Sequence, residues 1–353
     1  MIVKSFKDIK NLRNAENLNH VNIDMTQFVA GGIPNYVGKL GIWSLAKNGT
    51  LTINCSGAHS SPNVLRGKIS FNLLCQTLFP AILPYASIEK IDRSKNVITF
   101  RRTSPKQKSN NWSFGIIFSG DLTELSLLSN CISSIQNQSI FDNEWEIVVC
   151  GPADAEMMVI SQFDVNYLSY ENNSNHKRFN ISSKKNYLIK SLKHDKVLIC
   201  HTRICLEAEC ISNLPHEFEV ITPSVSITGN MGIIPYLDLG FIRGFTRNLN
   251  FVKTVPCHYN RNNWVSYLSK AIPYIDGGLY CINSLWVKDI NLSEHLAWAE
   301  AEDVEWCQRL NANGLMCELS LTALAYSQTC KIERYKKYGH SMIYRLISRI
   351  INL

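Results

Sequence analysis

The stretch FGIIFSGDLTELSLLSNCISSIQNQSIFDNEWEIVVC, residues 114–150, decides which fold the chain is expected to adopt. Residues 114–119 and 146–150 are short apolar runs of the kind that form buried strands. Between them, residues 125–138 place apolar side chains at helical spacing, and a Gly-Pro pair closes the second run. The order strand, helix, strand predicts a βαβ unit, in which a right-handed crossover joins two parallel strands.

Small and acidic residues follow both predicted strands. Ser119 and Gly120 come after the first strand, and Gly151 and Asp154 come after the second. Ligands of parallel α/β sheets bind at the carboxyl ends of the strands, so these residues are expected to line a ligand-binding edge. For Asp154 the alternative interpretation is an ordinary solvated loop carboxylate.

Length and composition describe an ordinary globular chain that is long enough for two domains. Of its 353 residues, 45% are hydrophobic, and the net charge of +7 favours anionic partners such as nucleotide phosphates, lipid headgroups or nucleic acid. The 12 cysteines are dispersed and form no Cys-x-x-Cys pair, which favours reduced thiols in a cytoplasmic protein and disfavours a zinc site. No apolar run approaches the length of a membrane span.

The first hundred residues are predicted to form a small α/β module. Residues 20–24 and 50–55 are expected strands, and residues 87–91 and 96–100 are an expected hairpin. This arrangement is weakly similar to the C-terminal half of a class I methyltransferase, but residues 1–20 supply no Gly-rich cofactor loop. The resemblance therefore implies a degenerate, non-catalytic module that serves docking or assembly.

Three segments are expected along the chain. The polar, basic sequence RRTSPKQKSNN, residues 101–111, interrupts the periodicity and marks a boundary. The module is therefore assigned to residues 1–105 and a second α/β domain to residues 110–335. Residues 336–353 are predicted to form a basic amphipathic C-terminal helix, which either packs against its own core or rests on an anionic membrane surface.

A second informative stretch, YIDGGLYCINSLWVKDINLSEHLAWAEAEDVEWCQRLNANG, covers residues 274–314. Gly277 and Gly278 suit a sharp turn or a close approach to a ligand, and a short strand is expected directly after them. Glu302 and Asp303 begin a predicted helix that has a glycine just beyond its end. The partly positive helix start is expected to hold these carboxylates ionised and able to accept a proton.

Together the two stretches resemble family 2 glycosyltransferases of the GT-A fold, over about residues 110–335. The features that carry the resemblance are the C-I-x-S-I-x-x-Q helix followed by E-I-V-V, and the order Gly-Gly, strand, Glu-Asp-x-Glu, x3, Arg. The resemblance implies an α/β fold with a Rossmann-like nucleotide-binding sheet. It also implies that Asp303 is the general base that deprotonates the acceptor hydroxyl, supported by Glu302 and Arg309. The residues expected to bind the donor are Ser119, Gly151, Asp154, Lys185, His201 and Arg203, and those expected on the acceptor side are Asp276, Gly277, Gly278 and Trp264.

The metal-binding motif of that family is replaced in this chain. The family ends the strand expected at residues 196–200 with Asp-x-Asp, whose carboxylates hold a divalent ion, but here the sequence is His201-Thr202-Arg203. Magnesium and manganese prefer oxygen ligands, and a guanidinium cannot be one, so no cofactor is certain and a divalent metal is disfavoured. The favoured interpretation is that Arg203 and His201 pair directly with the donor phosphates. The alternatives are a softer ion held by His201 and a site that has lost catalysis.

Aromatic and basic residues alternate in residues 237–259, and no nucleic-acid-binding motif surrounds them. The segment is interpreted as a loop that flanks the sugar site, with no nucleic acid partner. Trp264 and Tyr267 are candidate platforms for the acceptor sugar, and burial in the core is the alternative for each. Lys184 precedes Lys185, and the alternative to phosphate binding for this pair is a solvated helix face.

The expected function is that of an inverting glycosyltransferase, which moves a sugar from a nucleotide-sugar donor to a glycan or lipid-linked acceptor. The resemblance implies assembly of a bacterial surface polysaccharide. The cysteine usage favours a cytoplasmic enzyme, and the basic amphipathic segment at residues 336–353 would allow a peripheral position at the inner face of the membrane. Two alternatives stay open: a non-catalytic sugar-nucleotide-binding or scaffold protein, and a transferase that uses a phosphorylated sugar without a nucleotide. A methyltransferase is a more distant alternative.

Overall fold

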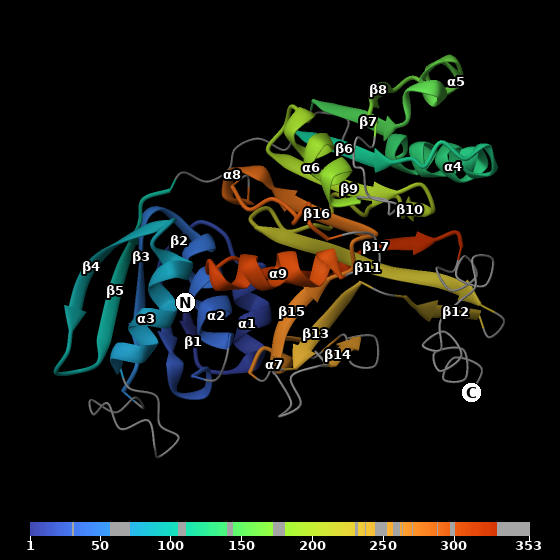
Figure 1. Cartoon of the computed structure of the whole chain (residues 1–353). Helices are drawn as coiled ribbons and strands as arrows, with labels where there is room; N and C mark the ends of the chain where they lie inside the picture. Colours follow the sequence, from blue (N-terminus) through green and yellow to red (C-terminus); the bar gives the residue numbers. More distant parts are fainter. Residues whose placement is uncertain are drawn as a thin grey trace.

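The computed structural model shows a mixed α/β fold, as the sequence predicts. The residues it describes are 1–29, 32–56, 71–104, 111–139, 144–171, 181–229, 232–236, 238–243, 253–256, 262, 264–269, 271–287, 289–296 and 301–329. Their strands form a five-stranded, a nine-stranded and a three-stranded sheet. Figure 1 shows the five-stranded sheet at one end of the molecule and the nine-stranded sheet at the other.

The N-terminal sheet has the strand order β1-β2-β3-β5-β4. Its strands are β1 (Ile2–Val3), β2 (Leu18–Asp24), β3 (Leu45–Asn54), β4 (Ala86–Asp92) and β5 (Val97–Arg102). The helical elements of this region are α1 (Phe6–Arg13), η1 (Met25–Gln27), α2 (Ile33–Trp43) and α3 (Phe71–Ile82). Strands β1, β2 and β3 are parallel, whereas β5 is antiparallel to both β3 and β4. Both predicted strands and the predicted hairpin are therefore confirmed.

The second sheet has the order β10-β17-β11-β16-β9-β6-β7-β8, and β12 pairs with β11. Its strands are β6 (Trp112–Ile117), β7 (Trp145–Gly151), β8 (Asn166–Ser169), β9 (Lys196–His201), β10 (Ile204–Leu206), β11 (Val220–Gly229), β12 (Gly232–Pro235), β16 (Leu279–Asn283) and β17 (Cys317–Ser327). Helix α4 (Leu125–Gln136) connects the parallel strands β6 and β7, so the predicted βαβ unit is confirmed.

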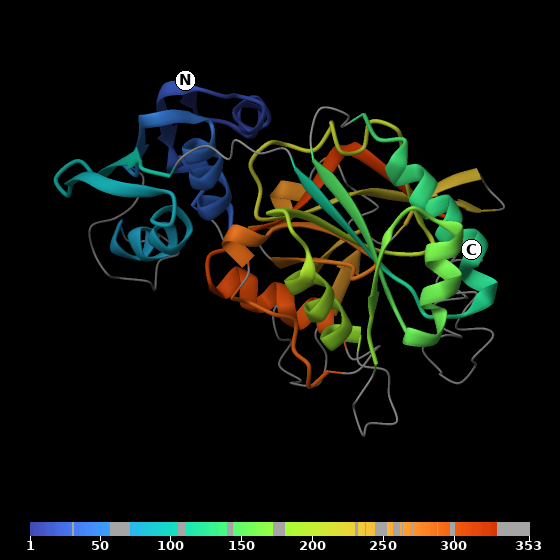
Figure 2. The ribbon, with the colours of Figure 1, turned by 90° about the horizontal axis from the view of Figure 1, so that it is seen from above.

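Helices cover both faces of this sheet, as Figure 2 shows. Helix α4 and the short α5 (Glu156–Gln162) lie on one face, and α6 (Ile181–Ser191) and α9 (Glu302–Ala312) lie on the other. Alternate side chains of β6 face the two layers: Phe114 packs in the same core cluster as Leu128 of α4, whereas Ile117 packs in that of α6 and α9. The remaining short helical elements are η3 (Leu122–Glu124), η4 (Ala153–Ala155), α7 (Trp264–Tyr267) and α8 (Ser284–Val287).

The third sheet lies partly in residues 237–259, which were interpreted as a loop. Its strands, in the order β14-β13-β15, are β13 (Leu239–Arg243), β14 (Lys253–Pro256) and β15 (Ala271–Ile275). The interpretation of residues 237–259 as a loop is wrong for β13 and β14. In β13 the apolar residues Leu239, Phe241 and Ile242 are buried, so both faces of this strand pack against the protein. The helix predicted at residues 336–353 lies outside the described residues. In the part of the chain that is described, no helix is long and apolar enough to span a membrane.

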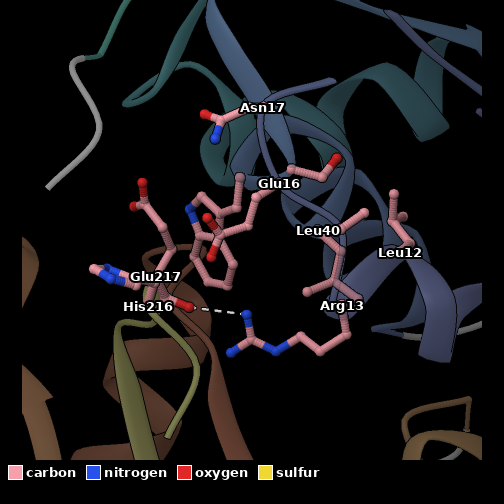
Figure 3. A pocket seen from close by; sticks show the side chains of 10 residues that line it. Leu12, Arg13, Glu16, Asn17, Leu40, His216 and Glu217 are labelled. Carbon is pink, nitrogen blue, oxygen red and sulfur yellow. Dashed lines mark hydrogen bonds between the residues drawn. The ribbon is translucent and has the colours of Figure 1, made fainter. Parts of the chain in front are cut away.

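Three ion pairs join the N-terminal region to the second sheet. Arg13 Nη2 lies 3.0 Å from Glu318 Oε2, Arg102 Nη2 lies 2.6 Å from Glu217 Oε1, and Lys39 pairs with the buried Glu219. Figure 3 shows the small cavity of about 100 Å³ at this boundary, where Arg13 also donates to the backbone oxygen of Glu217. The two regions therefore share a buried polar boundary.

Candidate functional site

One edge of the nine-stranded sheet collects the ends of several strands. Ile117, the last residue of β6, is in register with Cys150 of β7 and with His201 of β9. Strand β16 is antiparallel to β9 and begins at this edge, with Leu279 in register with Cys200. The segments that follow β6, β7 and β9 and the segment that precedes β16 therefore lie close together.

A cavity of about 440 Å³ opens at this edge. Ser119 and Asp154, two of the predicted donor-binding residues, line it and are exposed, and Gly151 lies beside it at the end of β7. The full lining is Ser119, Pro152, Ala153, Asp154, Tyr170, Glu171 and Lys184. Tyr170 and Glu171 are not among the residues predicted from the sequence. The signal that could have located them is the aromatic, apolar run of β8, which ends just before them.

Lys184 and Lys185 of α6 are buried at the same edge and are not solvated surface lysines. Lys184 is 2% exposed and its Nζ donates to the backbone oxygen of Phe118 over 2.6 Å, and burial lowers its pKa to about 8. Lys185 is 1% exposed, and its Nζ lies 3.6 Å from Glu302 Oε1 and 5.8 Å from the ring centroid of Tyr280. Lys184 thus places a positive charge beside Phe118, and Lys185 places one near Glu302.

The turn at Gly277 and Gly278 contacts Lys185 and two carboxylates. Gly277 N donates to Asp303 Oδ2 over 2.8 Å, and Gly278 N donates to Asp276 Oδ1 over 3.0 Å. A β-carbon on Gly277 would lie 2.7 Å from Lys185 Nζ, so the turn can approach these side chains only because it lacks one. Asp303, predicted as the base, therefore lies next to Asp276, Gly277 and Gly278, three of the four residues predicted on the acceptor side.

The pKa of Asp303 is raised above its ordinary value, first by burial and then by the negative charges of Asp276 and Glu302. Lys185 and the hydrogen bond from Gly277 lower the pKa of Asp303, and they offset only part of the increase. The direction is opposite to the expectation from the helix start, because desolvation and two like charges outweigh the helix dipole. A carboxylate with a raised pKa is the stronger proton acceptor once it is ionised.

Backbone strain accompanies this carboxylate. Ala301, which precedes the first residue of α9, has φ of 59° and ψ of 44°, in the left-handed region that residues with a β-carbon rarely adopt. Such strain persists where surrounding contacts hold it, and it is concentrated at functional sites. Its position next to Glu302 and Asp303 is consistent with a site at the start of α9.

Arg203 lies on the other side of the glycine turn. It is 6% exposed, and its Nε has no hydrogen-bond partner among the residues that the structure describes. A β-carbon on Gly278 would lie 2.6 Å from Arg203 Nη2. His201, at the end of β9, donates its backbone N–H to the oxygen of Gly278 over 3.1 Å and is partly exposed. The two predicted donor-binding residues after β9 therefore adjoin the turn that also contacts Asp303.

Two other predicted residues make their contacts away from the turn. Arg309 binds Glu305 one helical turn back, and its Nη2 donates to the backbone oxygen of Asn291 over 2.7 Å. Trp264, predicted on the acceptor side, is 4% exposed and packs edge-on against Tyr36 of α2, with ring centroids 5.3 Å apart. The contacts of Arg309 and Trp264 are thus with neighbouring residues of the fold and not with the glycine turn.

Among known proteins, matches are found with solved structures. No family model and no curated protein matches this sequence. Among solved structures, S. aureus TarS 1-349 in complex with UDP is 15% identical with a TM-score of 0.42, and the match covers 64% of this chain and 62% of that one. The same fragment in complex with UDP-GlcNAc is 14% identical with a TM-score of 0.43, covering 63% and 59%. The chain thus spans less than two thirds of these structures, and nothing in the comparisons supports the methyltransferase resemblance.

Proposed function

We propose that the protein is a glycosyltransferase that moves a sugar from a nucleotide-sugar donor to a hydroxyl group of a glycan or lipid-linked acceptor. The observation that carries the proposal is the glycine turn at residues 277–278, which holds the Asp303 carboxylate beside two buried cations. A base and cations at one point are what a transfer requires when a hydroxyl loses a proton and a diphosphate leaves.

In the proposed reaction, Asp303 accepts the proton of the acceptor hydroxyl. The acceptor oxygen then forms a bond to the anomeric carbon of the donor as the bond between that carbon and the diphosphate oxygen breaks, which inverts the configuration. Because its pKa is raised, Asp303 is better suited to this step than an ordinary surface carboxylate. Lys185 and Arg203 stabilise the negative charge that develops on the departing diphosphate.

The proposed place for the nucleotide is the cavity of about 440 Å³ at the carboxyl ends of β6, β7 and β8. Its volume is in the usual range of ligand pockets, and it offers the aromatic ring of Tyr170 together with polar groups from Ser119, Asp154 and Lys184. Inversion, and a role in bacterial surface polysaccharide assembly, are part of the proposal because the family resemblance implies them. The division into residues 1–105 and 110–335, which rests on the polar segment at residues 101–111, and a peripheral position at the membrane, which rests on residues 336–353, are also part of the proposal.

The proposal is tested by thermal-shift titration with nucleoside diphosphates and nucleotide-sugars. One nucleotide is expected to raise the melting temperature of the wild type, since a ligand that binds only the folded state stabilises it. Tyr170→Ala is expected to weaken that binding by about tenfold, through loss of a stacking surface. Asp92→Asn, at the end of β4 and far along the chain from the residues that line the cavity, is the control and should bind normally. Absence of a shift with every nucleotide would contradict the proposal.

A further inference from the structure

The residues after β9 do not fit the divalent cation that the family resemblance implies. A hard cation needs several oxygen ligands, but Arg203 carries only donors. The hydroxyl of Thr202 is turned inward, where it donates to Glu124 Oε2 over 3.1 Å. Across the described ranges, no group of three or more His, Cys, Asp or Glu side chains is arranged to hold a metal ion.

Arg203 is instead a buried cation whose guanidinium is not fully satisfied by the described residues. Its Nε is buried and has no hydrogen-bond partner among the described residues. A buried charge without a partner is costly, so proteins rarely keep one unless an anion binds there. The planar donor fork of arginine matches phosphate oxygens in a two-point contact.

Positive groups also extend from Arg203 toward the cavity. Lys185 Nζ and Arg203 Nη2 approach the two consecutive glycines of the turn, one glycine each. Lys184, the neighbour of Lys185 on α6, lines the cavity itself and reaches the end of β6 at Phe118. A ligand that runs from the cavity to the Asp303 carboxylate would therefore pass three buried cationic side chains.

We infer that Arg203, Lys185 and Lys184 form an anion subsite that binds the diphosphate of the donor directly, in place of a divalent cation. This inference rests on the proposed function, because it assigns the ligand of that same site. The subsite takes pyrophosphate or a nucleoside diphosphate in the presence of a metal chelator. When the sugar leaves, the electron pair of the broken bond stays on the diphosphate oxygen, and these cations balance the added negative charge.

The experiment is calorimetric titration of the full chain with inorganic pyrophosphate in EDTA. Binding is expected for the wild type, and Arg203→Gln is expected to weaken it by about tenfold or more, as loss of a charge-assisted contact predicts. Arg93→Gln removes an exposed arginine that hydrogen-bonds to Asn72, and this matched control should bind as the wild type does. The melting temperature of ligand-free Arg203→Gln should equal or exceed that of the wild type, because the variant removes a buried charge whose Nε has no hydrogen-bond partner among the described residues.

Three results would overturn the inference: no pyrophosphate binding in EDTA, binding that appears only after manganese or magnesium is added, and unchanged binding by Arg203→Gln with a lowered melting temperature. The last would make Arg203 a structural residue. A nucleotide-sugar titration separates this inference from the proposed function. Nucleotide-sugar binding that needs manganese removes the metal-free subsite and leaves the function standing, whereas pyrophosphate binding without any nucleotide-sugar binding removes the function and leaves the anion subsite.

Discussion

Asp303 shows how the surroundings of a single carboxylate outweigh its place in a helix. At the first turn of α9 the helix dipole favours the ionised form, yet the pKa of Asp303 is raised by burial, by Asp276 and by Glu302. The sequence predicts that an acid stands at the helix start. It does not predict the second carboxylate, because Asp276 meets Asp303 only through the fold of the glycine turn.

At this scale we predict a pH effect. The ionised form of Asp303 is the base, so kcat/KM should rise with pH as its proton is lost, with an apparent pKa above the ordinary value of 3.8. Asp276→Asn removes the largest nearby negative charge and keeps an acceptor for Gly278 N, so it should move the acid limb of the profile to lower pH. The measurement is a pH–rate profile of both proteins, and an acid limb that stays in place would contradict the prediction.

The same pKa shift fixes the sign of a stability effect. A carboxyl group whose pKa is raised in the folded state holds its proton more tightly than in the unfolded chain, so stability falls as pH rises from the unfolded pKa through the folded one. Above that range the ionised Asp303 costs folding free energy. Asp303→Asn should therefore melt at an equal or higher temperature than the wild type at neutral pH.

At the scale of the elements, the strained start of α9 is open to a direct test. Ala301 holds a positive φ, which costs a residue with a β-carbon about 1 kcal/mol. Ala301→Gly should relieve this strain and raise the free energy of unfolding by about 1 kcal/mol. Ala312→Gly, at the other end of the same helix in an ordinary helical conformation, should lower it by a similar amount. Urea unfolding measures both, and destabilisation by both variants would show that Ala301 is unstrained.

Helices and strands whose apolar residues recur at regular spacing could be predicted from the sequence. Elements in which a proline or a short length interrupts that spacing could not. The βαβ unit and the N-terminal hairpin follow simple patterns and appear where expected. Strand β11 lies near the middle of the sheet although it contains Pro223, which argues against a central strand. The structure accommodates it at a register shift between Pro223 and Ser224, where the pairing with β17 is irregular. The edge strand β8 is short and was not predicted. Tyr170, which follows it directly, was therefore not assigned to the site.

At the scale of the whole molecule, the contacts that join the N-terminal region to the second sheet could not be predicted from the sequence. Each of its three ion pairs joins residues more than a hundred positions apart. Beyond these pairs, the backbone of Gly314, just after α9, lies against Pro80 of α3: a β-carbon there would be 2.8 Å from the Pro80 carbonyl carbon. The N-terminal region therefore contacts the segment that follows the helix of Asp303.

We predict that breaking the innermost pair destabilises the whole protein. Glu219 also accepts hydrogen bonds from Tyr85 Oη and Met316 N, so Lys39→Met would leave a buried carboxylate without its cation. Removing one partner of a buried pair costs about 3–5 kcal/mol, which urea unfolding should detect as a single, earlier transition. Arg101→Met is the matched control, because its pair with Glu89 is exposed and should contribute about 1 kcal/mol or less. Two separate transitions in Lys39→Met, with the second unshifted, would indicate that the regions fold independently.

The decisive measurement is turnover of the nucleotide-sugar that the wild type binds, compared between the wild type and Asp303→Asn, with nucleotide affinity measured on the same samples. Asparagine keeps an acceptor for Gly277 N but cannot take a proton at this site. The glycosyltransferase proposal predicts that turnover falls by about 100-fold or more while nucleotide affinity and melting temperature are retained. Turnover by Asp303→Asn at the wild-type rate would contradict it, because the proton of the acceptor would then be taken by another group.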